Sequence, residues 1–155
     1  MKSGRLGPTE TVDTGAAARQ ALGRFQVETP GPGFTEMTDA IRRWVDESGI
    51  ENGLLTVFCR HTSASLTIQE NADPDVQRDL MTALDRLAPR DAGYVHDTEG
   101  PDDMPSHVRT MLTGASLSIP VLEGGLALGT WQGIYLIEHR DRPHRREIVL
   151  HVIGL

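Results

Sequence analysis

Apolar residues follow a strand pattern in the first half of the chain. Leu54, Leu55, Val57 and Phe58 open an apolar run, LLTVFCR, that is typical of a buried strand. From Ser63 to Gln69 apolar and hydroxyl residues alternate, which predicts a second strand with one buried and one polar face. The same pattern predicts a first strand at residues 24–29.

Three segments have helical spacing instead. Thr38 is a candidate N-cap for a helix that Gly49 would end. Asp73 followed by Pro74 is a strong start signal for a second helix. A short third helix is predicted at residues 106–113. The buried stripe of the second helix is predicted to consist of Val76, Leu80, Ala83, Leu84 and Leu87.

The second half of the chain reads as successive strands at residues 116–122, 126–128, 133–139 and 147–153, joined by turns. Strand following strand predicts an α+β fold with a mainly antiparallel sheet, a few packed helices and a single domain at residues 24–155. Residues 1–23 show no sustained period. They are predicted to form a flexible tail with a short helix at residues 16–22.

His61 stands where this pattern breaks. In an unbroken strand it would share a face with Leu55 and Val57, which are apolar, and with Ser63 and Ser65, which are polar. One face cannot be core before His61 and hydroxyl-lined after it. A bulge, bend or strand exit is therefore predicted close to His61, at the rim between core and cleft.

Candidate chemistry gathers at a few places. His61, His96 and His107 occur in polar surroundings, and three imidazoles suit a zinc-like ion with one open position, although solvated loop histidines remain the alternative. Residues 91–105 form a long loop without apolar period, as many functional loops do. Glu70 has no evident local partner and is the better candidate for acid–base chemistry.

Arginines concentrate in the last predicted turn, HRDRPHRR, which is suited to phosphate but is equally typical of a soluble turn. Glu138, on an otherwise apolar strand, needs a partner such as one of these arginines. The formal net charge of −7 argues against broad nucleic-acid binding. Lys2 is the single lysine, which excludes a P-loop lysine or Schiff-base catalysis in the rest of the chain.

The location of the protein is predicted from its single cysteine. Cys59 cannot form an internal disulfide, and the first residues do not resemble a secretory leader, so a reducing, cytoplasmic compartment is expected. No apolar run approaches the length of a membrane helix.

Together, HTSASLTIQENADPDVQRDL, YVHDTEGPDDMPSH, SLSIP, LALGTWQGIYLIEHR and the final RR resemble the YjbQ-like family from about residue 25 to the end. Some members of this family carry the name secondary thiamine-phosphate synthase. The resemblance implies a homotrimer with the histidine segments near subunit boundaries, and His61, His96 and His107 around a metal, zinc or magnesium, or an anionic ligand. It also implies catalytic roles for His61, Glu70, Asp103 and Arg146, and cofactor-binding roles for Gln132, Glu138 and Arg145. Ser63 is a further cofactor-binding candidate from its own chemistry, because a hydroxyl can donate to a phosphate oxygen.

The reaction implied by the resemblance joins hydroxymethylpyrimidine diphosphate to thiazole phosphate, with loss of pyrophosphate. Its partners would be phosphorylated small molecules, and neither nucleic acid nor membrane is expected. Two alternatives remain open at this point. One is a metal-dependent phosphoester hydrolase, and the other is a non-catalytic trimeric protein that binds a phosphorylated metabolite.

Overall fold

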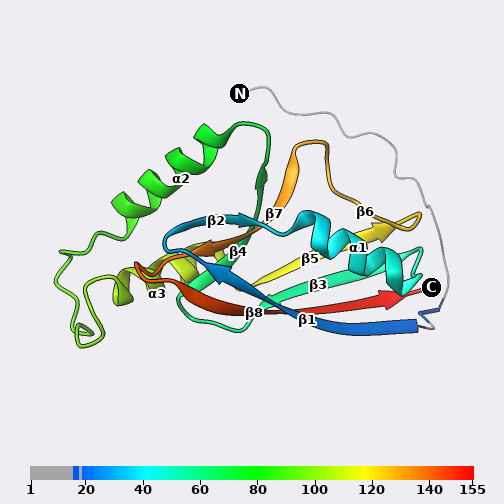
Figure 1. Cartoon of the computed structure of the whole chain (residues 1–155), viewed down its shortest axis with the longest axis horizontal. Helices are drawn as coiled ribbons and strands as arrows, with labels where there is room; N and C mark the ends of the chain where they lie inside the picture. Colours follow the sequence, from blue (N-terminus) through cyan, green and yellow to red (C-terminus); the bar gives the residue numbers. More distant parts are fainter. Residues whose placement is uncertain (1–15, 18) are drawn as a thin grey trace, which may run out of the picture.

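The computed structural model describes residues 16–17 and 19–155, and two antiparallel sheets dominate it (Figure 1). The larger sheet has the strand order β1-β8-β3-β5-β6, and the smaller has the order β2-β7-β4. The strands are β1 (Arg19–Thr29), β2 (Gly33–Glu36), β3 (Gly53–Cys59), β4 (Ala64–Glu70), β5 (Ser116–Leu122), β6 (Gly125–Leu126), β7 (Gln132–Glu138) and β8 (His144–Gly154). The predicted α+β class with antiparallel pairing is confirmed.

Three helices accompany the sheets: α1 (Thr38–Ser48), α2 (Pro74–Leu87) and α3 (Asp103–Thr113). In Figure 1, α2 lies at the periphery, and α3 lies at the end of the molecule where β7 and β8 meet. None of the helices in the described ranges has the length and apolarity that crossing a bilayer requires.

The hydrophobic core lies between the inward faces of the two sheets and the apolar face of α1. Leu55 and Val57 of β3 point into it, as do Leu136 of β7 and Ile41 of α1, and all four are fully buried. Burying such aliphatic side chains stabilises the fold by about 1.5–3 kcal/mol each. The inward residues of β3 and β8 recur at every second position, which fits the predicted strand alternation.

The predicted break at His61 is confirmed. Strand β3 ends at Cys59 and β4 begins at Ala64, so His61 lies in the connection between the two sheets. The predicted alternation of buried and polar positions in β4 fails at Ser65. This side chain is fully buried because α3 packs on this part of β4. The chain therefore leaves the central strand of the larger sheet and enters the smaller sheet after four residues.

Three local predictions are wrong. Of the predicted buried stripe of α2 only Leu84 is buried, and Ala83 and Leu87 are exposed, because α2 lies at the periphery (Figure 1). The N-cap of α1 is Met37 and makes no side-chain cap bond, while Thr38 lies inside the helix and its Oγ1 accepts the N–H of Ile134 at 2.9 Å. No helix forms between residues 19 and 22, because this segment extends β1, which starts at Arg19 and pairs with β8 as far as Gly154. Pairing with a distant strand overrides the weak local preference. The rest of the predicted tail lies outside the described residues, apart from residues 16 and 17.

Other boundaries differ by a few residues. The cap at Asp73 is confirmed, since its Oδ1 accepts the N–H of Asp75 at 2.9 Å. Helix α3 starts at Asp103, three residues earlier than predicted, because Pro105 is tolerated in a first helical turn. Strand β8 starts at His144, so Arg145 and Arg146 belong to the strand and not to the turn.

Candidate functional site

Helix α3 and the loop before it bring two histidines and one carboxylate together. One ligand atom each from His96, Asp103 and His107 lies within 4.8 Å of the other two. Nε2 of His96 is 2.6 Å from Oδ2 of Asp103, and Nε2 of His107 is 3.2 Å from the same oxygen. Asp103 is buried at the start of α3, whereas both histidines reach solvent.

The tautomer of His107 follows from its other ring nitrogen. Nδ1 of His107 lies 2.9 Å from the carbonyl oxygen of Thr62, which can only accept, so Nδ1 carries the proton. In the neutral ring, Nε2 then has a lone pair directed at Oδ2 of Asp103, which is also an acceptor. Two acceptors at this distance need a proton or a cation between them. A histidine fixed through a backbone carbonyl is the usual arrangement of a metal ligand.

Arg140 holds the carboxylate of Asp103 and that of the neighbouring Asp102. Its NH1 donates to Oδ1 of Asp103 at 2.5 Å, and its Nε donates to Oδ2 of Asp102 at 2.9 Å. Burial alone would raise the pKa of Asp103, but the hydrogen bond from His96 and the influence of His107 and Arg140 outweigh it and lower the pKa. Asp103 is therefore ionised at neutral pH and available as an oxygen ligand.

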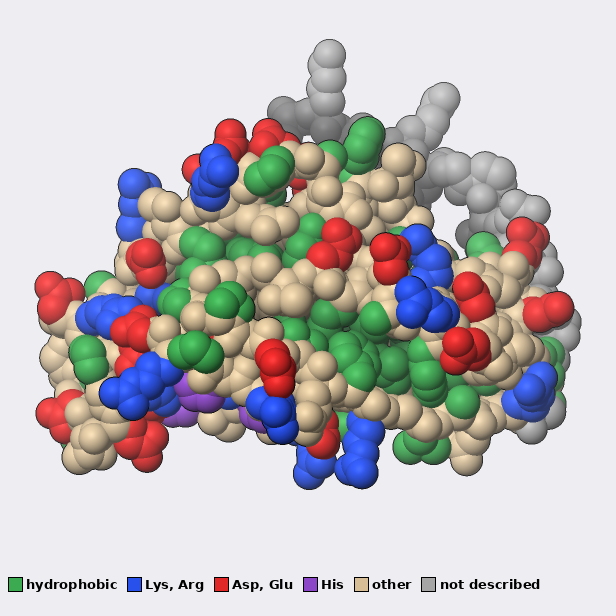
Figure 2. All heavy atoms as spheres, viewed as in Figure 1, with side chains coloured by type: hydrophobic (Ala, Val, Ile, Leu, Met, Phe, Trp, Pro, Cys, Tyr) green, Lys and Arg blue, Asp and Glu red, His purple; other side chains and the backbone are tan. Residues whose placement is uncertain are grey.

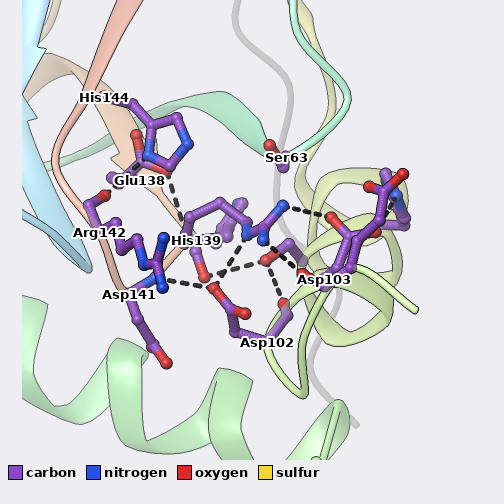
Figure 3. A network of polar contacts seen from close by, with 12 residues as sticks. Ser63, Asp102, Asp103, Glu138, His139, Asp141, Arg142 and His144 are labelled. Carbon is purple, nitrogen blue, oxygen red and sulfur yellow. Dashed lines mark hydrogen bonds and ion pairs between the residues drawn. The ribbon is translucent and has the colours of Figure 1, made fainter. Parts of the chain in front are cut away.

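The loop that carries His96 is held by one further ion pair and by hydrogen bonds. Arg90 donates two hydrogen bonds to Asp141, at 2.8 and 2.5 Å, and the N–H of Asp141 donates to Asp102 at 2.9 Å. Arg140 also donates to the carbonyl oxygen of Glu99 at 3.0 Å. Figure 3 shows Asp102 and Asp103 facing the segment of His139 and Asp141. The segment after β7 thereby positions the whole loop.

His61 is separate from this group. Its Nε2 accepts the N–H of Glu147 at 2.7 Å, so the lone pair of that nitrogen is already used. Burial, followed by the charge of Arg146, lowers the pKa of His61, in agreement with a neutral ring. The structure thus pairs His96 and His107 with Asp103, and does not bring His61 to the three-histidine arrangement that the sequence predicts.

Two predicted site residues, Arg146 and Glu138, form a buried ion pair between the sheets, and a third, Ser63, is hydrogen-bonded to Arg146. Arg146 donates from Nε to Oε2 of Glu138 at 2.7 Å and from NH2 to Oε1 at 2.5 Å. The same NH2 donates to Oγ of Ser63 at 3.0 Å. Arg146 and Glu138 are 5% and 1% exposed, so neither charge reaches solvent. The predicted pairing of Glu138 with an arginine is confirmed. The guanidinium of Arg146 is thereby engaged with Glu138 and with the hydroxyl of Ser63, and not with a surface site for a ligand.

The other predicted residues lie elsewhere. Oε2 of Glu70 accepts the N–H of Asp73 at 3.0 Å, so Glu70 does have a local role, at the start of α2. Gln132 accepts the N–H of Gly129 and is the register partner of Glu70. This pair is six residues along β4 from Ala64, about 20 Å from the strand end near Ser63. Arg145 forms an exposed ion pair with Glu28 at 3.0 Å.

One surface hollow is lined by His107 of the His96–Asp103–His107 group, and a second lies beside Asp102 and Arg140. One, of about 590 Å³, is lined by His61, His107, Phe58 and Met111 among others. The other, of about 550 Å³, is lined by Asp102, Arg140, Arg142 and His144 among others. Figure 2 shows histidines at the surface among acidic and basic side chains at this end. A small charged molecule can therefore reach the group from solvent.

The sequence contains a local signal that joins Asp103 to His107. The two residues are four apart, and a helix places such residues on one face. The predicted helix starts at residue 106 and does not include Asp103, so the pattern of apolar positions alone does not predict this pair. The role of Arg140 had no sequence signal, because its partners lie almost forty residues away.

Two antiparallel sheets with a His₂Asp group at the start of α3 define a class of small α+β proteins with a candidate metal centre. The chain belongs to the family described as UPF0047 protein YjbQ-like, whose model matches residues 23–155. This confirms the family predicted from the motifs.

The comparisons include relatives and solved structures. The UPF0047 protein sll1880 of Synechocystis is 49% identical over 144 residues, covering 92% of this chain and 98% of the relative. The hypothetical protein APE1520 of Aeropyrum pernix superposes with a TM-score of 0.81 at 30% identity, covering 87% of this chain and 99% of that one. An uncharacterized YjbQ/UPF0047 protein of Clostridium acetobutylicum gives a TM-score of 0.77 at 40% identity, covering 83% and 98%.

Proposed function

We propose that this protein is a metal-dependent transferase of the secondary thiamine-phosphate synthase kind. The observation that carries the proposal is the group formed by His96, Asp103 and His107, whose two imidazole nitrogens and one buried carboxylate oxygen converge. Two nitrogen ligands and one oxygen ligand suit zinc, with a fourth position left for substrate. Magnesium is the less suitable ion for this group, because it prefers oxygen ligands.

The residues around the group fit the binding of a metal. His107 already has the tautomer that leaves Nε2 free, and Arg140 orients the carboxylate of Asp103. A bound divalent cation would supply positive charge to a phosphorylated substrate, which is what departure of pyrophosphate requires. In the reaction, a carbon–nitrogen bond forms between the pyrimidine methylene and the thiazole nitrogen, and the carbon–oxygen bond to pyrophosphate breaks.

Arg142 is the arginine of the last turn that supports phosphate binding best. Arg140, Arg145 and Arg146 are all engaged in ion pairs with carboxylates. Within the described part of the chain Arg142 forms no ion pair, and it lines the 550 Å³ hollow with His144. We therefore propose Arg142, in place of the predicted Arg145 and Arg146, as the phosphate contact.

Substitution of His107 with alanine is expected to weaken zinc binding by about 100-fold, because loss of a ligand costs at least as much as loss of an outer contact. Titration calorimetry with zinc chloride measures this, together with metal analysis of the protein. In the same variant, formation of thiamine phosphate from the two precursors is expected to disappear. His151→Ala is the matched control, since His151 contacts Gln20 on β1 and not the group.

The same assays discriminate between the functions. A wild-type protein that binds no zinc or magnesium would contradict the metal centre. Phosphate release from phosphoesters without the second precursor would replace the transferase with a hydrolase. Tight binding of a precursor without turnover would instead establish a metabolite-binding protein.

Cys59 is buried and forms no disulfide with described residues, and a cytoplasmic location stays a prediction.

The outer face of the larger sheet supports a homotrimer. Leu22 of β1, Leu54 and Phe58 of β3 and Ile153 of β8 are between 40% and 68% exposed on adjacent strands. Several large apolar side chains on one open sheet face are typical of a contact surface between subunits. We propose that this face packs against other copies of the chain.

Light scattering is expected to give three times the 17.0 kDa chain mass at micromolar concentration. Leu54→Glu is expected to reduce this mass, because it places a charge within the proposed contact. Leu87→Glu, on the exposed end of α2, should not change it. A monomeric wild-type protein would contradict the trimer.

A further inference from the structure

His139 is a buried histidine that the proposed function does not use. It follows β7 directly and is 1% exposed. Its Nε2 lies 2.8 Å from Oγ of Ser65, and its backbone oxygen accepts the hydroxyl of Ser106 at 2.9 Å. Among the described residues, its Nδ1 has no hydrogen-bond partner. Such a fully enclosed imidazole requires a physical explanation.

The hydrogen bonds continue from Ser65 into helix α3. Oγ1 of Thr113 lies 2.6 Å from Oγ of Ser65 and 2.8 Å from the carbonyl oxygen of Arg109. His139 is therefore linked to Ser106 near the start of α3 and, through Ser65 of β4, to Thr113 at its end. These contacts join the helix, β4 and the segment after β7.

Counting protons gives a direction to this chain of hydrogen bonds. The carbonyl of Arg109 can only accept, so Thr113 donates to it, and Ser65 then donates to Thr113. Oγ of Ser65 in turn accepts a proton from Nε2 of His139. In the opposite direction Thr113 would no longer donate to Arg109, and a buried N–H at Nδ1 of His139 would find no acceptor among the described residues. The first direction leaves fewer groups unsatisfied.

The surroundings keep the ring neutral. Burial lowers the pKa of His139 to about 4, and the nearby charge of Arg109 contributes in the same direction. Both effects oppose protonation of the ring, so one ring nitrogen keeps its lone pair. The choice of tautomer rests on the proton count.

We propose that His139 is a positioning residue: as the neutral Nε2–H tautomer, it donates to Ser65 and fixes helix α3 against β4. Asp103 and His107 are both on this helix, and His107 must also meet the carbonyl of Thr62, which lies just before β4. A helix that shifts along β4 would separate Asp103 and His107 from these partners. The effect on metal binding rests on the proposed function, while the tautomer and the fixing of α3 do not.

NMR of protein labelled with ¹⁵N-histidine tests the tautomer directly. We expect a protonated Nε2 and an unprotonated Nδ1 for the signal that disappears in His139→Gln. The reverse assignment, or a charged ring at pH 7, would overturn the proposal. This measurement needs no metal and no substrate.

Amide hydrogen exchange tests the fixing of α3. Thr113→Val and His139→Leu are expected to speed exchange along α3 by about tenfold, while His139→Gln, which retains a donor for Ser65, should exchange close to wild type. Thr110→Val is the matched control, because the buried hydroxyl of Thr110 has no partner within the described ranges. Equal exchange in Thr113→Val and Thr110→Val would overturn the proposal, even if His139→Leu does not fold.

Zinc titration of the same variants connects the two proposals. His139→Leu or Thr113→Val should weaken zinc binding by about tenfold, and His139→Gln should largely restore it. Weakened exchange protection in these variants, together with a wild-type protein that binds no zinc, would refute the metal centre alone. If the wild type binds zinc and the variants bind it with unchanged affinity, the positioning role is overturned.

Discussion

Replacement of Arg146 with methionine is expected to lower the free energy of unfolding by about 3–5 kcal/mol. The substitution leaves the carboxylate of Glu138 buried at 1% exposure without its two guanidinium hydrogen bonds. Thr29 and the N–H of Arg140 still donate to Glu138, but they carry no charge. Urea unfolding measures the change in free energy. All proteins are compared at the same concentration, so that any contribution of subunit association is the same in each measurement.

The neighbouring arginine provides the control. Arg145→Met removes an ion pair whose side chains are 64% and 76% exposed, so a change of about 0–1 kcal/mol is expected. The double variant Arg146→Met with Glu138→Leu should recover most of the lost stability, because no unpaired charge then remains buried. Equal effects of Arg145→Met and Arg146→Met would show that Arg146 is not buried with Glu138 in solution.

As the pH decreases from 6.5 to about 4, proton uptake by His139 in the unfolded chain is expected to lower the free energy of unfolding by about 3 kcal/mol. Burial lowers the pKa of His139 from 6.5 to about 4 in the folded chain. Within this interval the unfolded chain binds a proton that the folded chain does not, so acidification favours unfolding. About 1.4 kcal/mol for each pH unit gives the stated size. Above pH 6.5 this contribution is complete and independent of pH.

The pH dependence of His139→Gln isolates this contribution. Protonation of other groups also lowers the free energy of unfolding on acidification. Among them are Asp103 and Glu138, whose pKa values are lowered in the fold despite the opposing effect of burial. These groups act below their ordinary pKa values of 3.8 and 4.5 and are common to both proteins. The difference between the two curves from pH 6.5 to 4 therefore reports His139. Parallel curves would contradict its neutral burial.

The two predictions concern one feature of this fold, a polar seam between the sheets next to the candidate metal centre. Glu138 and His139 are adjacent at the end of β7, and each is held by partners from other elements. Arg140, the next residue, contacts Asp102 and Asp103. Three consecutive residues thus tie the second sheet, the first sheet and helix α3 together. The seam explains why the centre can be rigid although His96 is in a loop.

Much of the fold was predictable because its signals are local. The apolar run from Leu54, the alternation after Ser63 and the cap at Asp73 each predict their element from a few residues. Errors occurred where distant pairing decides. Residues 19–22 are strand because β8 lies beside them, and Thr38 is helical because it accepts from Ile134.

The sequence by itself determined the α+β class, the break at His61 and the family, because periodicity and motif order are properties of the linear order of residues. It also singled out His96, His107, Glu138 and Arg146 as side chains that need polar partners. Only the tertiary structure decided which of them meet. It placed Asp103 between the two histidines, gave Arg146 to Glu138 and left His61 bonded to the backbone of Glu147. A charged side chain specifies that it needs a partner, but long-range packing selects the partner.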